Sequence, residues 1–156
     1  MRRQDREIKD QERILQILDR CEVMRLGMVE EQVPYVVPVN FGYEVMDGRV
    51  ILYFHGANQG RKAGILSGSP QVCFEMDHEI RIEKAELACQ WTSRYESIIG
   101  YGTASRLVTL PEQIRALDRI MEKYGFAGKP EYPEGMLNSM AVWKIEVQEI
   151  TGKSNS

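Results

Sequence analysis

The sequence predicts a mainly β, α+β fold, an antiparallel barrel with helices at its periphery. The strand-like segments follow one another directly in two runs, and neither run has the strand–helix alternation of repeated βαβ units. The chain has 156 residues, a length that suits one domain, so we expect a single domain over residues 1–156. Hydrophobic residues make up 43% of the chain and charged residues 28%, which indicates a buried core and excludes a disordered protein.

The N-terminal segment is predicted to be an arm followed by a helix. Residues 1–9 mix both charges around one apolar residue, Ile8, so we expect this arm to lie on the body of the protein or on a partner chain. Asp10 suits a helix N-cap. After it, apolar residues recur with the spacing of one helical face, and these are Ile14, Leu15, Ile17, Leu18 and Cys21.

A first run of strands follows this helix. Strands are predicted over residues 23–29, 33–45 and 49–55. The second of them contains Pro34 and Pro38, which cannot donate to a ladder, so we expect it to be an edge strand, bulged or interrupted. The Asp47-Gly48 pair predicts a hairpin turn, and the almost continuous apolar run after it indicates a strand covered on both sides.

The middle of the chain alternates a short helix with more strands. A loop over residues 56–60 leads into a helix over 61–66. Further strands are predicted over residues 71–76, 80–87 and 96–108. Gly100 and Gly102 share one face of the last strand, which indicates a bend or the close approach of another group.

The C-terminal part adds one helix and one strand. Thr109 and Glu112 form a capping box with Pro111 in the first turn, so a helix begins there. A loop rich in glycine and proline is expected over residues 125–139, and alternation of apolar and polar residues over 141–150 predicts a closing strand. In total, the sequence predicts six or seven strands and three helices.

The net charge and the cysteine content limit the possible functions of the protein. The net charge is −3, whereas a nucleic-acid-binding protein would normally carry a basic excess. No run of about 18 apolar residues is present, and the charged N-terminus has no apolar signal-peptide core, so neither a membrane span nor a signal peptide is expected. Three cysteines without metal-binding spacing favour a reduced cytoplasmic protein with mostly buried thiols.

Few residues fit metal binding or hydrolytic catalysis. His55 and His78 are the only histidines, and no HxH, HExxH, CxxC or GxSxG motif occurs, so we expect no metal site and no catalytic triad. Glu75 and Asp77 share one face of a predicted strand. They could act as an acid–base pair or simply form a solvated strand end.

The segment from Phe54 to Lys62 indicates a phosphate site. A buried strand ends in His55, a glycine-bracketed loop follows, and the next helix starts with Arg61 and Lys62. Cations at a helix N-terminus oppose the helix dipole. A bound phosphate would satisfy the free N–H groups, both cations and His55 together. The alternative is that Arg61 and Lys62 extend into water.

Two further segments suit contact with a flat ligand. Asn40 interrupts the apolar run 34–44 and offers a donor and an acceptor to a ring edge; the alternative is a satisfied asparagine in a bulge. In residues 91–102, aromatic residues and a small hydroxyl precede two glycines, which would let a flat ligand lie against the backbone. Ordinary core or interface packing would use the same aromatic residues.

Three motifs together resemble a known family. They are PYVVPVNFGYE (34–44), FHGANQGRK (54–62) and YESIIGYG (95–102), and the opening MRRQDREI, the RLGMV segment and the closing ITGK add to them. The chain resembles the FMN-binding split-barrel family of pyridoxamine 5'-phosphate oxidase-like proteins and, within it, the nitroimidazole-resistance branch. The resemblance covers nearly the whole chain.

The resemblance implies a six-stranded antiparallel split barrel that forms a homodimer with one FMN per subunit at the interface. The residues implied to bind the cofactor are Pro38, Val39, Asn40, Phe41, His55, Arg61, Lys62, Ser97 and Ile98. The first four would lie against the isoalloxazine ring, largely through their backbone. The next three would hold the phosphate, and the last two stand where the partner strand touches the flavin. His55 also matches a histidine that is important in the nitroimidazole-resistance branch, which makes it the candidate catalytic residue.

The implied function is that of an FMN-dependent oxidoreductase acting on a small molecule, for example by reducing a nitro group. No GxGxxG motif occurs, so NADH or NADPH would be a transient electron donor. The C-terminal WKIEVQEITGKSNS has no match to the arginine-containing segment of true pyridoxamine 5'-phosphate oxidases, so that activity is not expected. The alternatives are a flavin-binding module without turnover and a haem-binding split barrel with His55 or His78 as axial ligand.

Overall fold

One antiparallel sheet, curved into a barrel, forms most of the protein. The computed structural model describes residues 4–155. The helices are α1 (Gln11–Arg20), α2 (Arg61–Leu66), α3 (Leu110–Lys123) and α4 (Glu134–Ser139). The strands are β1 (Glu7–Ile8), β2 (Met24–Glu30), β3 (Val33–Val39), β4 (Phe41–Met46), β5 (Arg49–Ala57), β6 (Gln71–Glu83), β7 (Thr92–Arg106) and β8 (Met140–Ser154).

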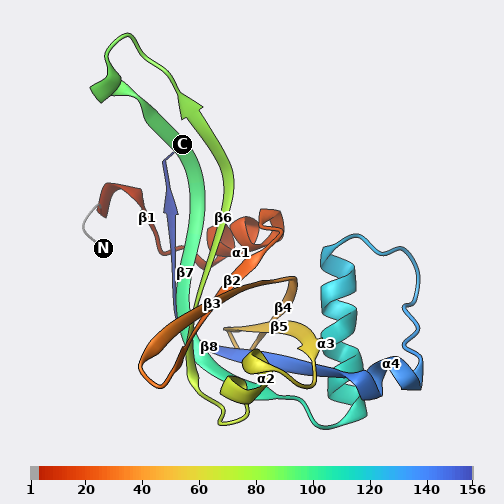
Figure 1. The fold of residues 1–156 in the computed structure, drawn as a ribbon. Coiled ribbons are helices and arrows are strands. Elements are labelled where there is room, and N and C mark those ends of the chain that lie inside the picture. Colours follow the sequence, from red (N-terminus) through yellow and green to blue (C-terminus); the bar gives the residue numbers. More distant parts are fainter. Residues whose placement is uncertain (1–3, 156) are drawn as a thin grey trace.

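The strand order β3-β2-β6-β7-β8-β5-β4 confirms the predicted split barrel (Figure 1). β3 and β4 are one stretch of chain interrupted at Asn40, so the barrel consists of six chain segments, and the two-residue β1 adds to the edge of β8. The pairing of β1 places residues 7–8 of the predicted arm on the body of the protein. Residues 1–3 lie outside the described part of the chain.

The interruption predicted for one strand is confirmed, whereas two other predictions were wrong in extent. The segment 33–45 is interrupted, as its prolines suggested, but the break falls at Asn40 rather than at a proline. The segments 71–76 and 80–87 are not separate strands, because β6 continues to Glu83 through a register shift between His78 and Arg81. A short helix, α4, occupies part of the predicted loop 125–139.

The two glycines of β7 are sites of close approach, as predicted. A Cβ at Gly100 would lie 2.2 Å from the Phe74 ring. A Cβ at Gly102 would lie 2.4 Å from the carbonyl oxygen of Glu146, and the register between β7 and β8 shifts just before this glycine. Hydrogen at these positions lets the strands bend into a barrel.

Local signals in the sequence formed the expected caps and turns. The Asp10 carboxylate accepts from the Arg13 N–H at 2.8 Å at the start of α1. The capping box of Thr109 and Glu112 is present at the start of α3. Asp47 and Gly48 both have positive φ, 50° and 77°, in the turn between β4 and β5, as a type I′ hairpin requires.

The core consists of two apolar clusters. The larger one fills the barrel and includes the fully buried Phe41, Phe54, Phe74, Ile98 and Trp143. The smaller one lies between α3 and the outer faces of β5 and β8. Its buried members are Tyr53, Leu107, Ala116, Leu117, Ile120 and Val142.

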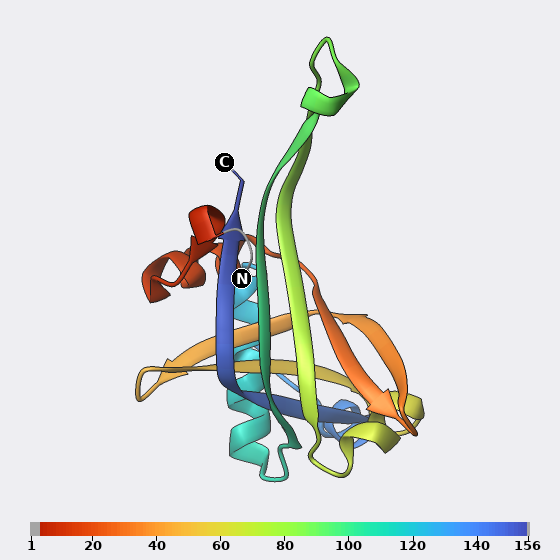
Figure 2. The same cartoon turned by 90° about the vertical axis from the view of Figure 1, so that its left-hand side faces the viewer.

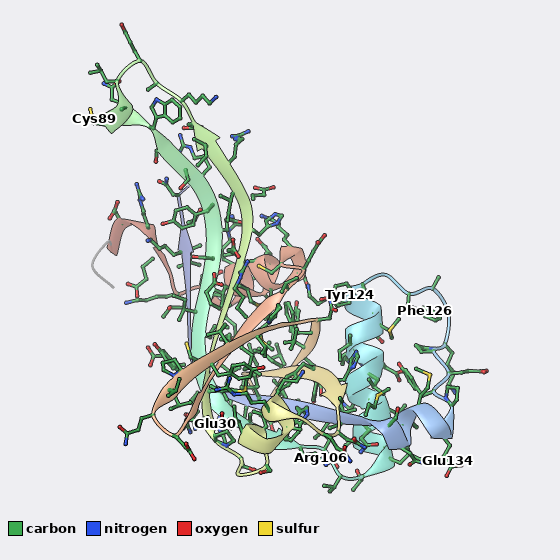
Figure 3. All side chains as sticks on the ribbon, viewed as in Figure 1. Glu30, Cys89, Arg106, Tyr124, Phe126 and Glu134 are labelled. Atoms are coloured by element: carbon green, nitrogen blue, oxygen red, sulfur yellow. The ribbon has the colours of Figure 1, made fainter. Side chains whose placement is uncertain are left out.

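The far parts of β6 and β7 form an arm, residues 79–95, that stands away from the barrel (Figures 1 and 2). Cys89 lies at its tip and is exposed (Figure 3), while Cys21 is buried and Cys73 half-buried. At the base of the arm, the buried Glu96 carboxylate accepts from Arg13 and Arg20, which fastens α1 to β7. No helix within residues 4–155 is long and apolar enough to cross a membrane.

Candidate functional site

Lys62 folds back over the end of β5. Its Nζ lies 2.5 Å from where a Cβ at residue 56 would be, so glycine at this position lets the lysine side chain lie directly over the strand. The same Nζ lies 5.7 Å from the centroid of the Phe54 ring. The loop reaches α2 through Gly60, whose φ of 106° suits glycine.

This end of β5 carries a positive charge that has no counter-ion among residues 4–155. Burial lowers the pKa of Lys62, and within residues 4–155 no carboxylate forms an ion pair with it. His55 keeps an exposed edge, but burial of its ring, together with the charge of Lys62, lowers the pKa of this imidazole. A half-buried cation beside an imidazole is a site that an anion would stabilise.

Arg61 faces another direction. Its Nε donates to the Glu30 carboxylate at 2.8 Å, and its guanidinium lies 4.2 Å from the centroid of the Tyr35 ring. Arg61 therefore links α2 to the β2–β3 hairpin. Within residues 4–155 its Nη groups make no hydrogen bond, so the half-exposed guanidinium still has free donors.

Asn40 lies at the same end of the β4–β5 pair as His55. The ladder pairs Phe41 of β4 with Phe54 of β5. Asn40 directly precedes Phe41, and His55 directly follows Phe54. The exposed Asn40 donates from Nδ2 to the Tyr124 hydroxyl at 3.1 Å. Asn40 and His55 thus stand at one end of the β4–β5 pair, and Lys62 lies over the neighbouring Gly56.

Other predicted residues can reach a ligand only through their backbone. The side chains of Val39, Phe41 and Ile98 are buried in the barrel core. The Phe41 N–H also donates to Tyr124 at 3.3 Å, which leaves it unavailable to a ligand. Pro38, in contrast, is exposed on the edge strand β3.

Ser97 lies elsewhere on the same chain. It pairs with Asp77 in the β6–β7 ladder and lines a hollow of about 360 Å³ on the outer face of the sheet. In this hollow Glu75 and Asp77 both accept from Arg25. The two carboxylates are therefore neutralised by a cation, which favours a structural role for them over acid–base catalysis.

The sequence was compared with models of known families. The family model described as pyridoxamine 5'-phosphate oxidase matches residues 10–154. The chain belongs to this family. The resemblance stated from the motifs is confirmed.

Solved structures share the fold of this chain. A protein of Bacteroides thetaiotaomicron, provisionally assigned to 5-nitroimidazole antibiotic resistance, is 30% identical, with 94% of this chain and 85% of that chain covered and a TM-score of 0.81. The flavocytochrome Anf3 of Azotobacter vinelandii is 20% identical, with coverage of 100% and 72% and a TM-score of 0.80. An FAD- and haem-binding protein of Mycobacterium smegmatis is 17% identical, with coverage of 97% and 74% and a TM-score of 0.84. No curated protein matches the chain.

Sequence reasoning missed several residues around this pyridoxamine 5'-phosphate oxidase-like site. Tyr124 and Glu30 hold predicted site residues from elements remote in sequence, and no local pattern marks them. A cavity of about 540 Å³ also lies beside the loop, between α2 and the β7–β8 strands. It is lined by Asn58, Gln59, Gly60, Ala63, Gly64, Ser67, Arg106 and Trp143.

Proposed function

We propose that the protein binds FMN and acts as a flavin-dependent oxidoreductase on a small molecule. The observation that carries this proposal is Lys62, a half-buried ammonium group that lies over Gly56 and has no carboxylate partner among residues 4–155. A phosphate is the natural counter-ion for such a site, because it brings two negative charges and strong acceptors.

The residues fit the cofactor. Lys62 and His55 would hold the phosphate, with the free Nη groups of Arg61 within the same turn of α2. Asn40 and the exposed Pro38 would lie beside the ring. When bound, the flavin supplies two-electron redox chemistry, and the protein supplies binding, orientation and electrostatics. The provisional assignment of the Bacteroides relative to 5-nitroimidazole resistance favours a nitro compound as the electron acceptor.

A second copy of the chain would complete the site. Ser97 lies on the outer face of the sheet, where its own chain offers neither His55 nor Lys62. Exposed apolar residues, among them Ile99 and Tyr101, lie on the same face of β7. A homodimer would place this face against the flavin of its partner. Three free cysteines suit a reducing compartment, the cytoplasm.

The absorption spectrum of the purified protein tests the cofactor. A flavin spectrum, with FMN released on denaturation, is the expected result. A haem Soret band without flavin would overturn the proposal. The chain would then be a haem-binding split barrel.

Affinity for FMN and for riboflavin, which lacks the phosphate, tests Lys62. We expect Lys62→Ala to raise the Kd for FMN by roughly 10- to 100-fold, the cost of a lost charged hydrogen bond, and to leave riboflavin binding unchanged. Lys129→Ala, at an exposed loop position, is the matched control and should alter neither. If Lys62→Ala lowered the affinity for FMN and for riboflavin equally, or lowered neither, Lys62 would not bind the phosphate.

Anaerobic stopped-flow kinetics test the reaction. NADH or NADPH should reduce the bound flavin, and a nitroimidazole should reoxidise it faster than oxygen does. If the flavin binds but no acceptor outpaces oxygen, the protein is a flavin-binding module and the reductase assignment is wrong.

A further inference from the structure

The Tyr124 hydroxyl joins three separate parts of the chain. Tyr124 follows the last residue of α3 and faces the corner between β3 and β4 (Figure 3). Its hydroxyl lies 2.5 Å from the carbonyl oxygen of Glu22, 3.1 Å from Asn40 Nδ2 and 3.3 Å from the Phe41 backbone nitrogen. It therefore connects α3, the segment after α1 and the corner that carries Asn40.

Donor and acceptor chemistry fixes the direction of each of these bonds. A phenol has one proton to donate, and the Glu22 carbonyl can only accept, so the proton is directed there. The hydroxyl must then accept from the Phe41 N–H and from Asn40. Only the NH₂ end of the Asn40 amide can donate, so this amide has one allowed orientation.

The allowed orientation leaves Asn40 Oδ1 free. Asn40 is exposed, and no group within residues 4–155 donates to its carbonyl oxygen. The corner therefore presents this acceptor, beside the second N–H of the same amide, to anything that lies next to it. An acceptor selects a ligand that carries an N–H or O–H group.

The hydroxyl itself is firmly placed. The neighbouring Lys123 donates from Nζ to the carbonyl oxygens of Leu18 at 2.7 Å and of Asp19 at 3.1 Å, near the end of α1. The same Nζ lies 4.6 Å from the centroid of the Phe41 ring. These contacts hold the end of α3 against the β3–β4 corner, so the Tyr124 hydroxyl keeps a fixed position next to the Asn40 amide.

We infer that Tyr124 is a positioning residue for ring recognition. It acts through Asn40 by turning Oδ1 toward the ligand, where Oδ1 accepts from a ring N–H. This inference rests on the proposed function and deepens it. An oxidised flavin ring has one N–H group, at N3 between two carbonyls, and this is the group that Asn40 would recognise.

The test compares FMN with N3-methyl-FMN, which lacks that N–H. The Kd ratio of the two ligands is measured for the unmodified protein, Tyr124→Phe, Asn40→Ala and the double variant. We expect the unmodified protein to prefer FMN about tenfold. Tyr124→Phe should lose most of this preference, Asn40→Ala should lose all of it, and the double variant should match Asn40→Ala. Partial unfolding would weaken the binding of both ligands equally. The ratio of their Kd values therefore reports the positioning of Asn40 and not the stability of the fold.

Tyr43→Phe is the matched control, since it removes a hydroxyl that donates to the Asp19 carboxylate at 2.6 Å and has no hydrogen bond to Asn40 or Tyr124 within residues 4–155. It should keep the full preference for FMN. A preference retained in Tyr124→Phe would overturn the inference while leaving FMN binding intact. Failure of every variant and of the unmodified protein to bind FMN would instead overturn the proposed function.

Discussion

At the scale of single residues, the candidate site contains two titratable groups, Lys62 and His55. Burial disfavours the charged form of each. Burial lowers the pKa of Lys62, and burial together with Lys62 lowers that of His55. Both effects favour the neutral imidazole in the free protein. A bound phosphate would reverse this preference, because a nearby negative charge favours the imidazolium form.

This coupling predicts a pH dependence of FMN binding. Since binding would raise the pKa of His55, a proton is taken up on binding, and affinity should rise as the pH falls from 8 to 6.5. The phosphate, with a second pKa near 6, stays largely dianionic in this range. Fluorescence titration should show the rise for the unmodified protein and not for His55→Gln. The same slope in both proteins would exclude His55 from the phosphate site.

The cysteines give a second prediction for single residues. Burial raises the pKa of Cys21 to about 11, whereas Cys89 is exposed at the tip of the arm. Thiolates are the reactive species, so iodoacetamide at pH 8 should modify Cys89 first and Cys21 only after unfolding. Mass spectrometry of digests over time measures this order. Early modification of Cys21 would show that α1 opens in the native state.

At the scale of elements, α3 lies directly on the backbone of β4. A Cβ at Gly42 would be 2.5 Å from the backbone carbon of Arg119 and 2.5 Å from the nitrogen of Ile120. No side chain separates the helix from the strand at this point. The placement of Tyr124 at the corner follows from this contact, because the close approach sets how far α3 stands from the barrel.

Gly42→Ala should therefore destabilise the fold by about 1–3 kcal/mol, the cost of overpacking a filled site. Gly64→Ala in α2 is the matched control, since its Cβ would meet no atom within 4 Å beyond the helix backbone, and it should stabilise by about 0.5–1 kcal/mol. Urea unfolding measures both. If Gly42→Ala left the free energy of unfolding unchanged, α3 would have to shift away from β4 without an energetic cost.

Elements specified by near neighbours were predicted well from the sequence. The cap at Asp10, the box at Thr109 and the turn at Asp47-Gly48 all depend on residues within a few positions. The extent of β6 was not predictable. Its continuation beyond His78 requires pairing with β7, and the register shift before Arg81 leaves no local signal.

The same distinction holds in the site. His55 and Lys62 are seven positions apart, so the motif alone placed them together. Asn40 and Tyr124 are 84 positions apart, and only the docking of α3 brings them into contact. The sequence groups Arg61 with Lys62 because both are cations at the start of a helix, yet the carboxylate of Glu30 directs Arg61 toward β2.

At the scale of the whole molecule, the outer face of β7 remains uncovered in a single chain. Ile99 is 45% exposed and Tyr101 48%, and both alternate with the buried Ile98 and Gly100. Exposed apolar residues grouped on one face commonly mark an interface. This is the face that carries Ser97.

The combined change Ile99→Glu and Tyr101→Glu should therefore convert a dimer to a monomer. The unmodified protein should sediment at twice the 18.0 kDa of the chain, and the variant at 18.0 kDa, because introduced charges would have to be desolvated at the interface. Val108→Glu, at a loop position that is 79% exposed, is the control and should leave the mass unchanged. A monomeric unmodified protein would remove Ser97 from the site.

The arm of β6 and β7 leaves the barrel where its neighbours end. β2 accompanies β6 only as far as Glu75, and β8 accompanies β7 only from Glu96 onward. The register shift between His78 and Arg81 lies just beyond these points, at the root of the arm (Figure 2). The irregularity therefore marks the point where β6 stops pairing within the barrel wall and continues as one strand of the two-stranded arm.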